Sequence, residues 1–312
     1  MSKYLITGGA GFIGSNIAKE LLARGEKVRI LDNFSTGKRE NVEGFKNNPN
    51  FELVEGDLRD LETVKKACEG VDFILHQGAL PSVPRSIKDP MGVNEVNTLG
   101  TLNILEAAKE FGIKRVVFAS SSSIYGNDPT LPKHEEMSVS PLSPYALTKY
   151  AGERYCQLYH QLYGLETVAL RYFNVFGPNQ DPSSEYSAVI PKFIKLISEN
   201  KRPTIYGDGT NSRDFTFVAN NVAANIAACT AEKASGQVMN IACGERYTLL
   251  DLIKAINEIL GKNIEPEFQP ERTGEVKHSM ADISRAQEIL DFAVKTKFKE
   301  GLEETIKSMG LK

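Results

Sequence analysis

The stretch TGGAGFIG, residues 7–14, separates a short apolar segment, Lys3–Thr7, from a segment whose apolar residues have helical spacing. Its glycines at positions 8, 11 and 14 form the pattern G-x-x-G-x-x-G. In such a turn one glycine permits the tight bend, another lets the backbone approach a pyrophosphate, and the third lets the helix pack closely on the strand. The helix start adds free N–H groups and the positive end of its dipole. The pattern predicts a dinucleotide-binding turn, with a purely structural glycine turn as the alternative.

Two acidic residues that end later apolar segments bear on the type of cofactor. Asp32 ends the second segment, in ILDN, where a carboxylate accepts hydrogen bonds from an adenosine ribose and repels a 2′-phosphate. We therefore expect NAD and not NADP. Asp57, in EGDLRD, ends the third segment, where the adenine would lie, but a simple helix cap would explain it equally well.

Apolar, β-rich segments alternate with helical patterns through the first half of the chain, which indicates βαβ units and a parallel sheet. After about Phe176 this regularity ends, although 186–199 and 249–260 again have helical patterns. We expect an α/β fold with a doubly wound parallel Rossmann sheet over residues 1–176, to which the chain partly returns around 213–243. A smaller C-terminal α/β substrate lobe would occupy residues 177–312. The expected strands are Lys3–Thr7, Lys27–Asp32, Phe51–Glu55, Asp72–His76, Arg115–Ala119 and Thr167–Arg171.

The composition excludes several classes of protein. With 41% hydrophobic residues, 25% charged residues and a formal net charge of −3, the chain has no basic run that points to a nucleic acid or a membrane surface. No stretch approaches the ~20 apolar residues that span a bilayer, and the opening MSKYLITGGAG lacks the apolar core of a secretory signal. The four cysteines are widely spaced, so neither a metal site nor a disulfide framework is indicated. We expect a cytoplasmic protein.

Tyr145 and Lys149, in SPYALTK, lie four residues apart and so share one face of a predicted helix. A phenol titrates near ~10, which is too high for a base at neutral pH. A nearby ammonium and a positive nicotinamide ring would both lower that pKa. Tyr145 is therefore a candidate acid–base group, and Lys149 can also hold the nicotinamide ribose.

Several motifs together identify a family. TGGAGFIG, Asp32, GDLRD, SSSSIYG, SPYALTK, RYFNVFGP and the stretch from Gly207 to Phe215 resemble the extended short-chain dehydrogenase/reductases that act on nucleotide sugars. The resemblance covers nearly the whole chain and is greatest to the UDP-hexose 4-epimerases, particularly the branch that accepts N-acetylated sugars. It implies a seven-stranded Rossmann domain, bound NAD and a UDP-sugar substrate. The cofactor residues that it implies are Gly8, Gly11, Phe12, Ile13, Gly14, Asp32, Asn33, Asp57, Leu58, Gln77, Tyr145 and Lys149.

The resemblance gives a role to the four consecutive serines in FASSSSIYG, residues 118–126. In the family, a Ser or Thr four positions before the Tyr-Gly pair bonds the sugar O4, and here that residue is Ser121. Relatives that dehydrate dTDP-glucose carry an acid and a base at the next two positions, where this chain has Ser122 and Ser123. A hydroxyl is unsuited to acid–base work near neutral pH, so only hydride and proton transfer at C4 remain. A strand-end turn without a ligand is the alternative.

Further substrate contacts are implied by the resemblance alone. Asn174 corresponds to the family's diphosphate-contacting asparagine, and Arg213 and Arg272 correspond to its phosphate-binding arginines, whose forked donors suit a diphosphate. Each could equally be an ordinary surface residue. The complete set of expected substrate residues is Ser82, Arg85, Ser121, Ser122, Ser123, Tyr145, Asn174, Ala188, Val189, Lys192, Tyr206, Arg213, Arg272, Glu275 and Ser279.

Two of these positions bear on the size of the sugar. Epimerases restricted to glucose and galactose have a bulky tyrosine where this chain has Ser279, in HSMAD, and a larger asparagine where it has Ala188. Smaller residues enlarge the pocket beside the sugar C2, unless neighbouring side chains refill the space. The resemblance therefore implies that N-acetylated sugars are accepted.

The resemblance implies reversible inversion at C4 of a UDP-hexose, UDP-GlcNAc/UDP-GalNAc as well as UDP-Glc/UDP-Gal, with Tyr145, Lys149 and Ser121 as catalytic residues. A UDP-glucuronate 4-epimerase is an alternative, because its relatives also carry serine-rich strands here, although it would need a cationic or donor-rich site for the carboxylate. A non-catalytic NAD-binding regulator is another, although it would have no reason to keep these three residues together.

A homodimer is also implied, because in the family the helices over 97–111 and 145–163 pair across a two-fold axis as a four-helix bundle. In the second helix we expect Ala146, Tyr150, Tyr155 and Leu158 to leave apolar surface beyond what the sheet covers.

Overall fold

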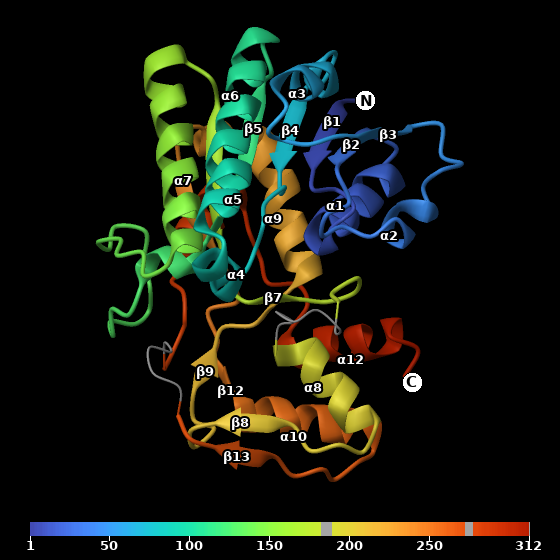
Figure 1. Ribbon diagram of the computed structural model, residues 1–312, viewed down its shortest axis with the longest axis vertical. Coiled ribbons are helices and arrows are strands. Elements are labelled where there is room, and N and C mark those ends of the chain that lie inside the picture. Colours follow the sequence, from blue (N-terminus) through green and yellow to red (C-terminus); the bar gives the residue numbers. More distant parts are fainter. Residues whose placement is uncertain (182–188, 272–276, 312) are drawn as a thin grey trace.

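The computed structural model describes residues 1–181, 189–271 and 277–311 (Figure 1). Its centre is a seven-stranded sheet in which every pair of neighbours is parallel, in the order β11-β6-β5-β4-β1-β2-β3. The expected doubly wound Rossmann fold is confirmed, with a change of winding direction between β1 and β4, where ligands bind in such sheets. The strands are β1 (Lys3–Thr7), β2 (Lys27–Asp32), β3 (Phe51–Glu55), β4 (Phe73–His76), β5 (Arg115–Ser121), β6 (Thr167–Tyr172) and β11 (Val238–Ile241).

Helices cover both faces of this sheet (Figure 1). Successive side chains of a strand point to opposite faces, so Leu5 packs into one core cluster and its neighbour Ile6 into the other. The cluster containing Leu5 lies under α3 (Leu61–Cys68), α6 (Gly100–Glu110) and α7 (Pro144–Tyr163). The cluster containing Ile6 lies under α1 (Phe12–Ala23), α9 (Val218–Thr230) and α11 (Ser284–Leu290). Both faces are therefore buried, which explains why these strands are apolar throughout.

A buried asparagine ties the loop after β4 to α7. The helical stretch before α6 consists of α4 (Val83–Lys88), α5 (Pro90–Asn94) and a π-helical turn, η1 (Glu95–Leu99). From η1, Asn97 accepts from the backbone N–H of Leu80 (2.7 Å) and donates to the hydroxyl of Thr148 on α7 (3.1 Å). This link fixes the loop beside the switch point of the sheet.

The second half of the chain adds a smaller group of helices and short strands below the sheet (Figure 1). The helix expected over 249–260 is confirmed, and that expected over 186–199 is described from Val189 to Ser198. The division at residue 176 remains a prediction. The remaining elements are α2 (Glu40–Glu43), η2 (Ser122–Tyr125), β7 (Val175–Phe176), α8 (Val189–Ser198), β8 (Thr204–Tyr206), β9 (Ser212–Arg213), β10 (Thr216–Phe217), η3 (Glu232–Ala234), β12 (Tyr247–Thr248), α10 (Leu249–Leu260), β13 (Glu267–Gln269) and α12 (Phe298–Ser308).

The expected outward face of α7 was partly wrong. Ala146 is only 2% exposed, because it lies on the same helix face as Lys149 and Gly152, which packs on the strand β5. Tyr150 and Tyr155 are partly buried against core clusters, whereas Leu158 is exposed as expected. The exposed apolar side chains that α7 does carry are Leu147, Leu158, Leu162 and Tyr163. No helix within the described ranges is both long enough and apolar enough to cross a bilayer.

Candidate active site

The glycine turn after β1 leaves no room for side chains. Gly8 has a φ of +64°, and a Cβ there would lie 2.7 Å from the Cα of Gly78. A Cβ on Gly14 would lie 2.4 Å from the carbonyl oxygen of Gly8. The helix α1 begins at Phe12 without a side-chain cap. This turn therefore has the tight bend, the close approach and the open helix start that a pyrophosphate requires.

A cavity of about 600 Å³ opens beside this turn along the carboxyl ends of the strands. All the cofactor residues expected from the resemblance line it, from Gly8 to Lys149, although they come from four different strand ends and α7. Ser82 and Arg85, which were expected beside the sugar, also line this cavity. The donors, acceptors and bare backbone of the cavity fit a dinucleotide such as NAD.

Asp32 and Asp57 occupy different positions in this cavity. Asp32 accepts from the backbone N–H groups of Ala10 (2.9 Å) and Phe34 (2.8 Å), so its carboxylate lies against the glycine turn, and burial raises its pKa. Asp57 accepts from Arg59 and from Asn33 (2.9 Å), and Arg59 holds the pKa of that carboxyl well below its usual range. The alternative of a helix cap is wrong for Asp57, because Asp60 caps α3.

Gln77 belongs to a polar network at the inner end of the cofactor cavity. Its amide nitrogen donates to Asn225 Oδ1 (3.0 Å), and the hydroxyl of Tyr172 contacts both Gln77 Oε1 (3.0 Å) and Asn225 Oδ1 (2.9 Å). Next to Gln77, His76 is buried between the hydroxyls of Thr7 and Thr101. Burial lowers the pKa of His76 to about 3, so this ring is neutral at physiological pH.

Tyr145 and Lys149 reach the cavity from the first turns of α7. The hydroxyl of Ser143 caps this helix and Pro144 begins it, which fixes its start. Lys149 is 5% exposed, and its Nζ donates to the carbonyl oxygen of Ala119 on β5 (2.8 Å). Burial lowers the pKa of Lys149 to about 8, which still leaves most of the ammonium charged at neutral pH.

The protein groups alone do not lower the pKa of Tyr145, contrary to our expectation. Burial raises the pKa of this phenol, and a hydrogen bond with Ser121 opposes the rise only in part. Lys149 does not contribute, because its side chain is bonded to Ala119 instead. Of the two causes that we expected, only the positive nicotinamide ring remains.

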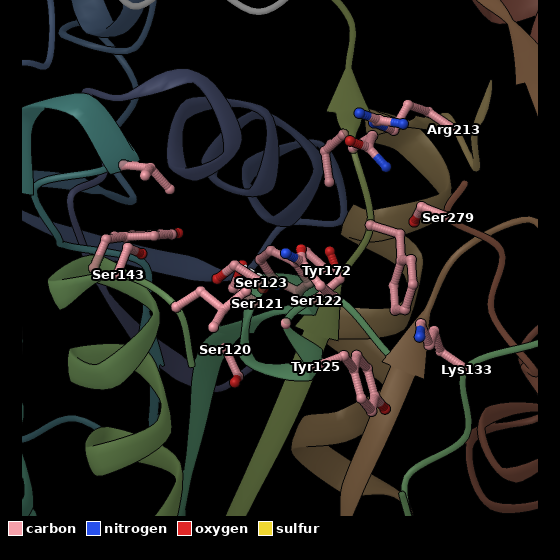
Figure 2. Close-up of a pocket in the computed structure, with 18 of the residues that line it drawn as sticks. Ser120, Ser121, Ser122, Ser123, Tyr125, Lys133, Ser143, Tyr172, Arg213 and Ser279 are labelled. Atoms are coloured by element: carbon pink, nitrogen blue, oxygen red, sulfur yellow. Dashed lines mark hydrogen bonds between the residues drawn. The ribbon is translucent and has the colours of Figure 1, made fainter. Parts of the chain in front are cut away.

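A second cavity, of about 550 Å³, joins the first where Tyr145, Ser120 and Tyr172 line both. Figure 2 shows Ser121, Ser122 and Ser123 beside Tyr172, with Arg213 and Ser279 on one side and Lys133 and Tyr125 on the other. The strand β5 extends two residues further than expected, to Ser121, which pairs in register with Tyr172. The Ser121 oxygen accepts from the hydroxyl of Ser123 (2.9 Å). This arrangement directs serine hydroxyls into the cavity.

The other expected substrate residues differ in whether they line a cavity. Asn174, Arg213 and Ser279 line the second cavity with the serines, and Arg213 donates to the carbonyl oxygens of Ser212 and Lys277. Within the described part of the chain, three expected residues line neither cavity: Val189 and Lys192 on α8, and Tyr206 on β8. Three others lie outside the described residues: Ala188, Arg272 and Glu275.

Sequence reasoning missed several residues of the second cavity, among them Lys133, Tyr172, Phe173 and His278. Tyr172 and Phe173 had a usable signal, because Tyr172 ends β6 and Phe173 follows it directly, next to Asn174. Lys133 had none, because it lies in the long segment between η2 and α7, and it lines the cavity through a bridge to Ala281.

Comparisons with known proteins agree with this geometry. The model of the NAD dependent epimerase/dehydratase family matches residues 4–242. The chain is 38% identical over 304 residues, 97% of its length and 96% of the other, to a UDP-glucose 4-epimerase of Mycolicibacterium smegmatis. It is similar in structure to a UDP-N-acetylglucosamine 4-epimerase from Methanobrevibacter ruminantium in complex with UDP-N-acetylmuramic acid, with 41% identity, a TM-score of 0.94 and coverage of 99% and 98%. It is also similar to a UDP-glucuronic acid 4-epimerase from Bacillus cereus in complex with UDP-glucuronic acid and NAD, with 33% identity, a TM-score of 0.91 and coverage of 99% of each chain. The chain therefore belongs to the NAD-dependent epimerase/dehydratase family, which confirms the resemblance that its motifs carry.

Proposed function

We propose that the protein interconverts the C4 epimers of UDP-hexoses, UDP-GlcNAc and UDP-GalNAc as well as UDP-Glc and UDP-Gal. The observation that carries this proposal is the position of Tyr145 at the junction of the two cavities, in reach of Ser121 and on the same helix face as Lys149. A phenol at that junction can exchange a proton with a sugar hydroxyl whose carbon faces the nicotinamide.

In this proposal the chain's own residues move and hold protons. Tyr145 takes the proton of the sugar 4-hydroxyl and later returns it, while Ser121 bonds the same oxygen and orients it. Lys149 holds the nicotinamide ribose, and bound NAD supplies reversible hydride acceptance at C4. The 4-keto sugar turns about its diphosphate linkage between the two transfers. The proposed cycle consumes no cofactor, so the purified protein should carry NAD.

In this proposal, the acceptance of N-acetylated sugars depends on Ser279, which lines the sugar cavity. An N-acetyl group adds three heavy atoms at C2, and the pocket must hold it in both orientations of the 4-keto sugar. A tyrosine at this position would fill that space. Ser279→Tyr should therefore strongly reduce UDP-GlcNAc/UDP-GalNAc interconversion and preserve UDP-Glc/UDP-Gal activity, since a steric clash of ~1–3 kcal/mol corresponds to a roughly 5- to 150-fold loss.

A panel of UDP-sugars, with products separated by anomeric NMR, tests both statements. UDP-GlcNAc and UDP-Glc should each yield the C4 epimer without added cofactor. Consumption of NAD in proportion to product would instead identify a net dehydrogenase. Equal losses on both sugar pairs in Ser279→Tyr would indicate general damage instead of a size gate.

UDP-glucuronate is the second candidate substrate, because a buried cation lies in the wall of the sugar cavity. Lys133 is 3% exposed; its Nζ donates to the backbone oxygen of Asp128 and lies 3.9 Å from the carboxylate of the same residue, which leaves at least one further donor on the ammonium. An ammonium there would favour a carboxylate on the sugar. Lys133→Met should then abolish turnover of UDP-glucuronate in the panel and spare UDP-Glc.

The alternative of a non-catalytic regulator is disfavoured by membership of an enzyme family.

The homodimer and the cytoplasmic location remain predictions. Support for the dimer comes from exposed apolar side chains on α7 and on the segment before α6, among which Leu162 is 67% exposed and Met91 is 70% exposed. Isolated apolar side chains are normal on a surface, but a group of them on neighbouring helices favours a protein interface.

A further inference from the structure

A buried ion pair lies below the candidate catalytic residues. Arg171, near the end of β6, donates from Nη2 to Glu153 Oε1 (2.6 Å) and from Nε to Glu153 Oε2 (3.0 Å). Glu153 is 1% exposed and Arg171 is 4% exposed. Removing two charges from water is costly, and an apolar pair of similar size is often as stable. Stability alone therefore does not explain why this pair is here.

The pair is aligned with the reaction centre along one face of α7. Tyr145, Lys149 and Glu153 follow one another at intervals of four residues, so they lie one above the other on the helix. Each is bonded to successive residues of β5: Glu153 accepts from Ser120 (2.9 Å), Lys149 donates to Ala119 (2.8 Å), and Tyr145 bonds Ser121. The helix is thus held to the strand by polar contacts at the level of the site.

Glu153 would attract Lys149 if its carboxylate were free. Neighbours at this spacing lie about 5–6 Å apart between Cβ atoms, which is within reach of a lysine side chain. Both oxygens of Glu153 are instead occupied by Arg171 and Ser120. We propose that Arg171 is a positioning residue: by occupying Glu153, it leaves the Lys149 ammonium directed toward Ala119 and the nicotinamide ribose. This inference rests on the proposed function, in which Tyr145 and Lys149 carry the reaction.

The guanidinium of Arg171 is itself held in place. Its Nη1 donates to the hydroxyl of Tyr125 (2.8 Å) and to the carbonyl oxygen of Glu135 (3.3 Å). The hydroxyl of Tyr125 in turn donates to Asn240 Oδ1 on β11 (2.7 Å). Because the fork is bonded on both sides, Arg171 cannot release Glu153 by a rotamer change alone.

Other ionisable groups lie on the elements packed around α7. On β4, His76 stays neutral because burial holds its pKa at about 3. The helix α5 contains no ionisable side chain. On β5, Arg115 is paired with Glu166, and on β6, Tyr172 is bonded to Gln77 and Asn225. The remaining groups on the packed elements are Tyr125 in η2, Arg85 and Lys88 in α4, Glu95 in η1, which is paired with Arg59, and Glu106, Lys109 and Glu110 in α6, which are paired with one another or with Lys65.

The experiment measures the pKa of Lys149 directly, by NMR titration of its ¹³Cε resonance in the protein as purified, assigned by its loss in Lys149→Met. Arg171→Met leaves Glu153 unpaired and should raise this pKa by about 1 unit or more, since an opposite charge within ~4–6 Å has an effect of this size. Glu153→Gln leaves Arg171 unpaired and should lower it by a similar amount. The double variant removes both charges and should restore a pKa close to that of the wild type.

The opposite directions of the expected pKa changes in the two single variants distinguish a positioning role from a merely structural one. A merely loosened site would admit water in both single variants and move the pKa of Lys149 upward in each, and that result, or no change in either, would overturn the proposal. If Arg171→Met does not fold, the downward shift in Glu153→Gln decides alone. The matched control is Arg115–Glu166, a 2.6 Å pair between the first residue of β5 and the residue before β6, at the ends of these strands away from the site. Arg115→Met and Glu166→Gln should leave the pKa of Lys149 unchanged.

A second readout follows the reaction itself. Lys149 acts as an ammonium, so the alkaline limb of kcat should move to higher pH in Arg171→Met and to lower pH in Glu153→Gln, with KM for the UDP-sugar little changed. If the wild-type protein epimerises none of the UDP-sugars, the proposed function fails, while the NMR titration still decides whether Arg171 and Glu153 set the charge of Lys149.

Discussion

Replacing Lys149 by methionine should change how the stability of the protein depends on pH. The amine has an ordinary pKa of 10.5 and burial lowers it to about 8 in the folded chain. Between these two values the unfolded chain binds a proton that the folded chain has lost, so the free energy of unfolding rises with pH across this window. Below about pH 8 the folded protein carries the full cost of the buried ammonium, which is about 3 kcal/mol at ~1.4 kcal/mol per pKa unit.

The same pKa values give the size of the effect. From pH 7.5 to pH 9.5 the wild-type protein should gain about 2 kcal/mol relative to Lys149→Met, which has no amine to titrate. The variant also loses the hydrogen bond to the carbonyl oxygen of Ala119, at a cost of ~1–3 kcal/mol. That cost does not depend on pH, so the difference between the two slopes is the informative quantity.

Urea unfolding of the NAD-stripped proteins at a series of pH values measures these slopes. Lys254→Met serves as the control, because Lys254 is exposed on α10. The control should follow the wild type, and Lys149→Met should show a flatter rise above pH 8. If Lys149→Met keeps the wild-type slope, the ammonium is not destabilised by burial, and the reasoning about the charge of Lys149 would be refuted.

Three further predictions concern turnover, cofactor binding and assembly. Tyr145→Phe should bind NAD and UDP-sugar but lose on the order of 10² or more in turnover, which steady-state kinetics would show. Gly14→Ala should be purified with little NAD, because the new Cβ lies 2.4 Å from the Gly8 carbonyl oxygen, whereas Gly44→Ala, which meets nothing within 4 Å, should retain it. Leu162→Glu should shift the protein from dimer to monomer in sedimentation at micromolar concentration, and a wild-type protein that is already monomeric would contradict the proposed interface.

The sequence predicted most where local pattern and position agree. The strand bounds and the cofactor cavity follow from periodicity and from the rule that parallel strands present their carboxyl ends at one edge. Asp32 was expected in that cavity because it ends a strand, whereas Gln77, which follows β4, was implied by the resemblance alone. The number of residues that separate two such positions in the sequence does not matter, because the sheet brings their strand ends together.

Residues outside the strands were predicted less well, for physical reasons. Tyr206 lies on β8 and lines neither described cavity. Its position depends on how the second half of the chain packs, and the periodicity of the sequence does not encode that packing. Lys133 enters the sugar cavity through a pairing with Ala281, 148 residues later in the chain. The face of α7 was misjudged at Ala146 because a helix with polar residues on its buried side gives no clear apolar stripe.

That polar buried side is also where the chemistry is controlled. Burial raises the pKa of Tyr145 and lowers that of Lys149, so in the protein without ligands both side chains are shifted toward their neutral forms. A phenolate would then be formed only when a positive nicotinamide ring lies beside Tyr145, because no protein cation contacts the phenol in the described residues. Arg171 cannot supply that charge, since it is bonded to Glu153. Under the proposed function the base would therefore be generated only in the loaded site, which would confine proton abstraction to the moment when a hydride acceptor is in place.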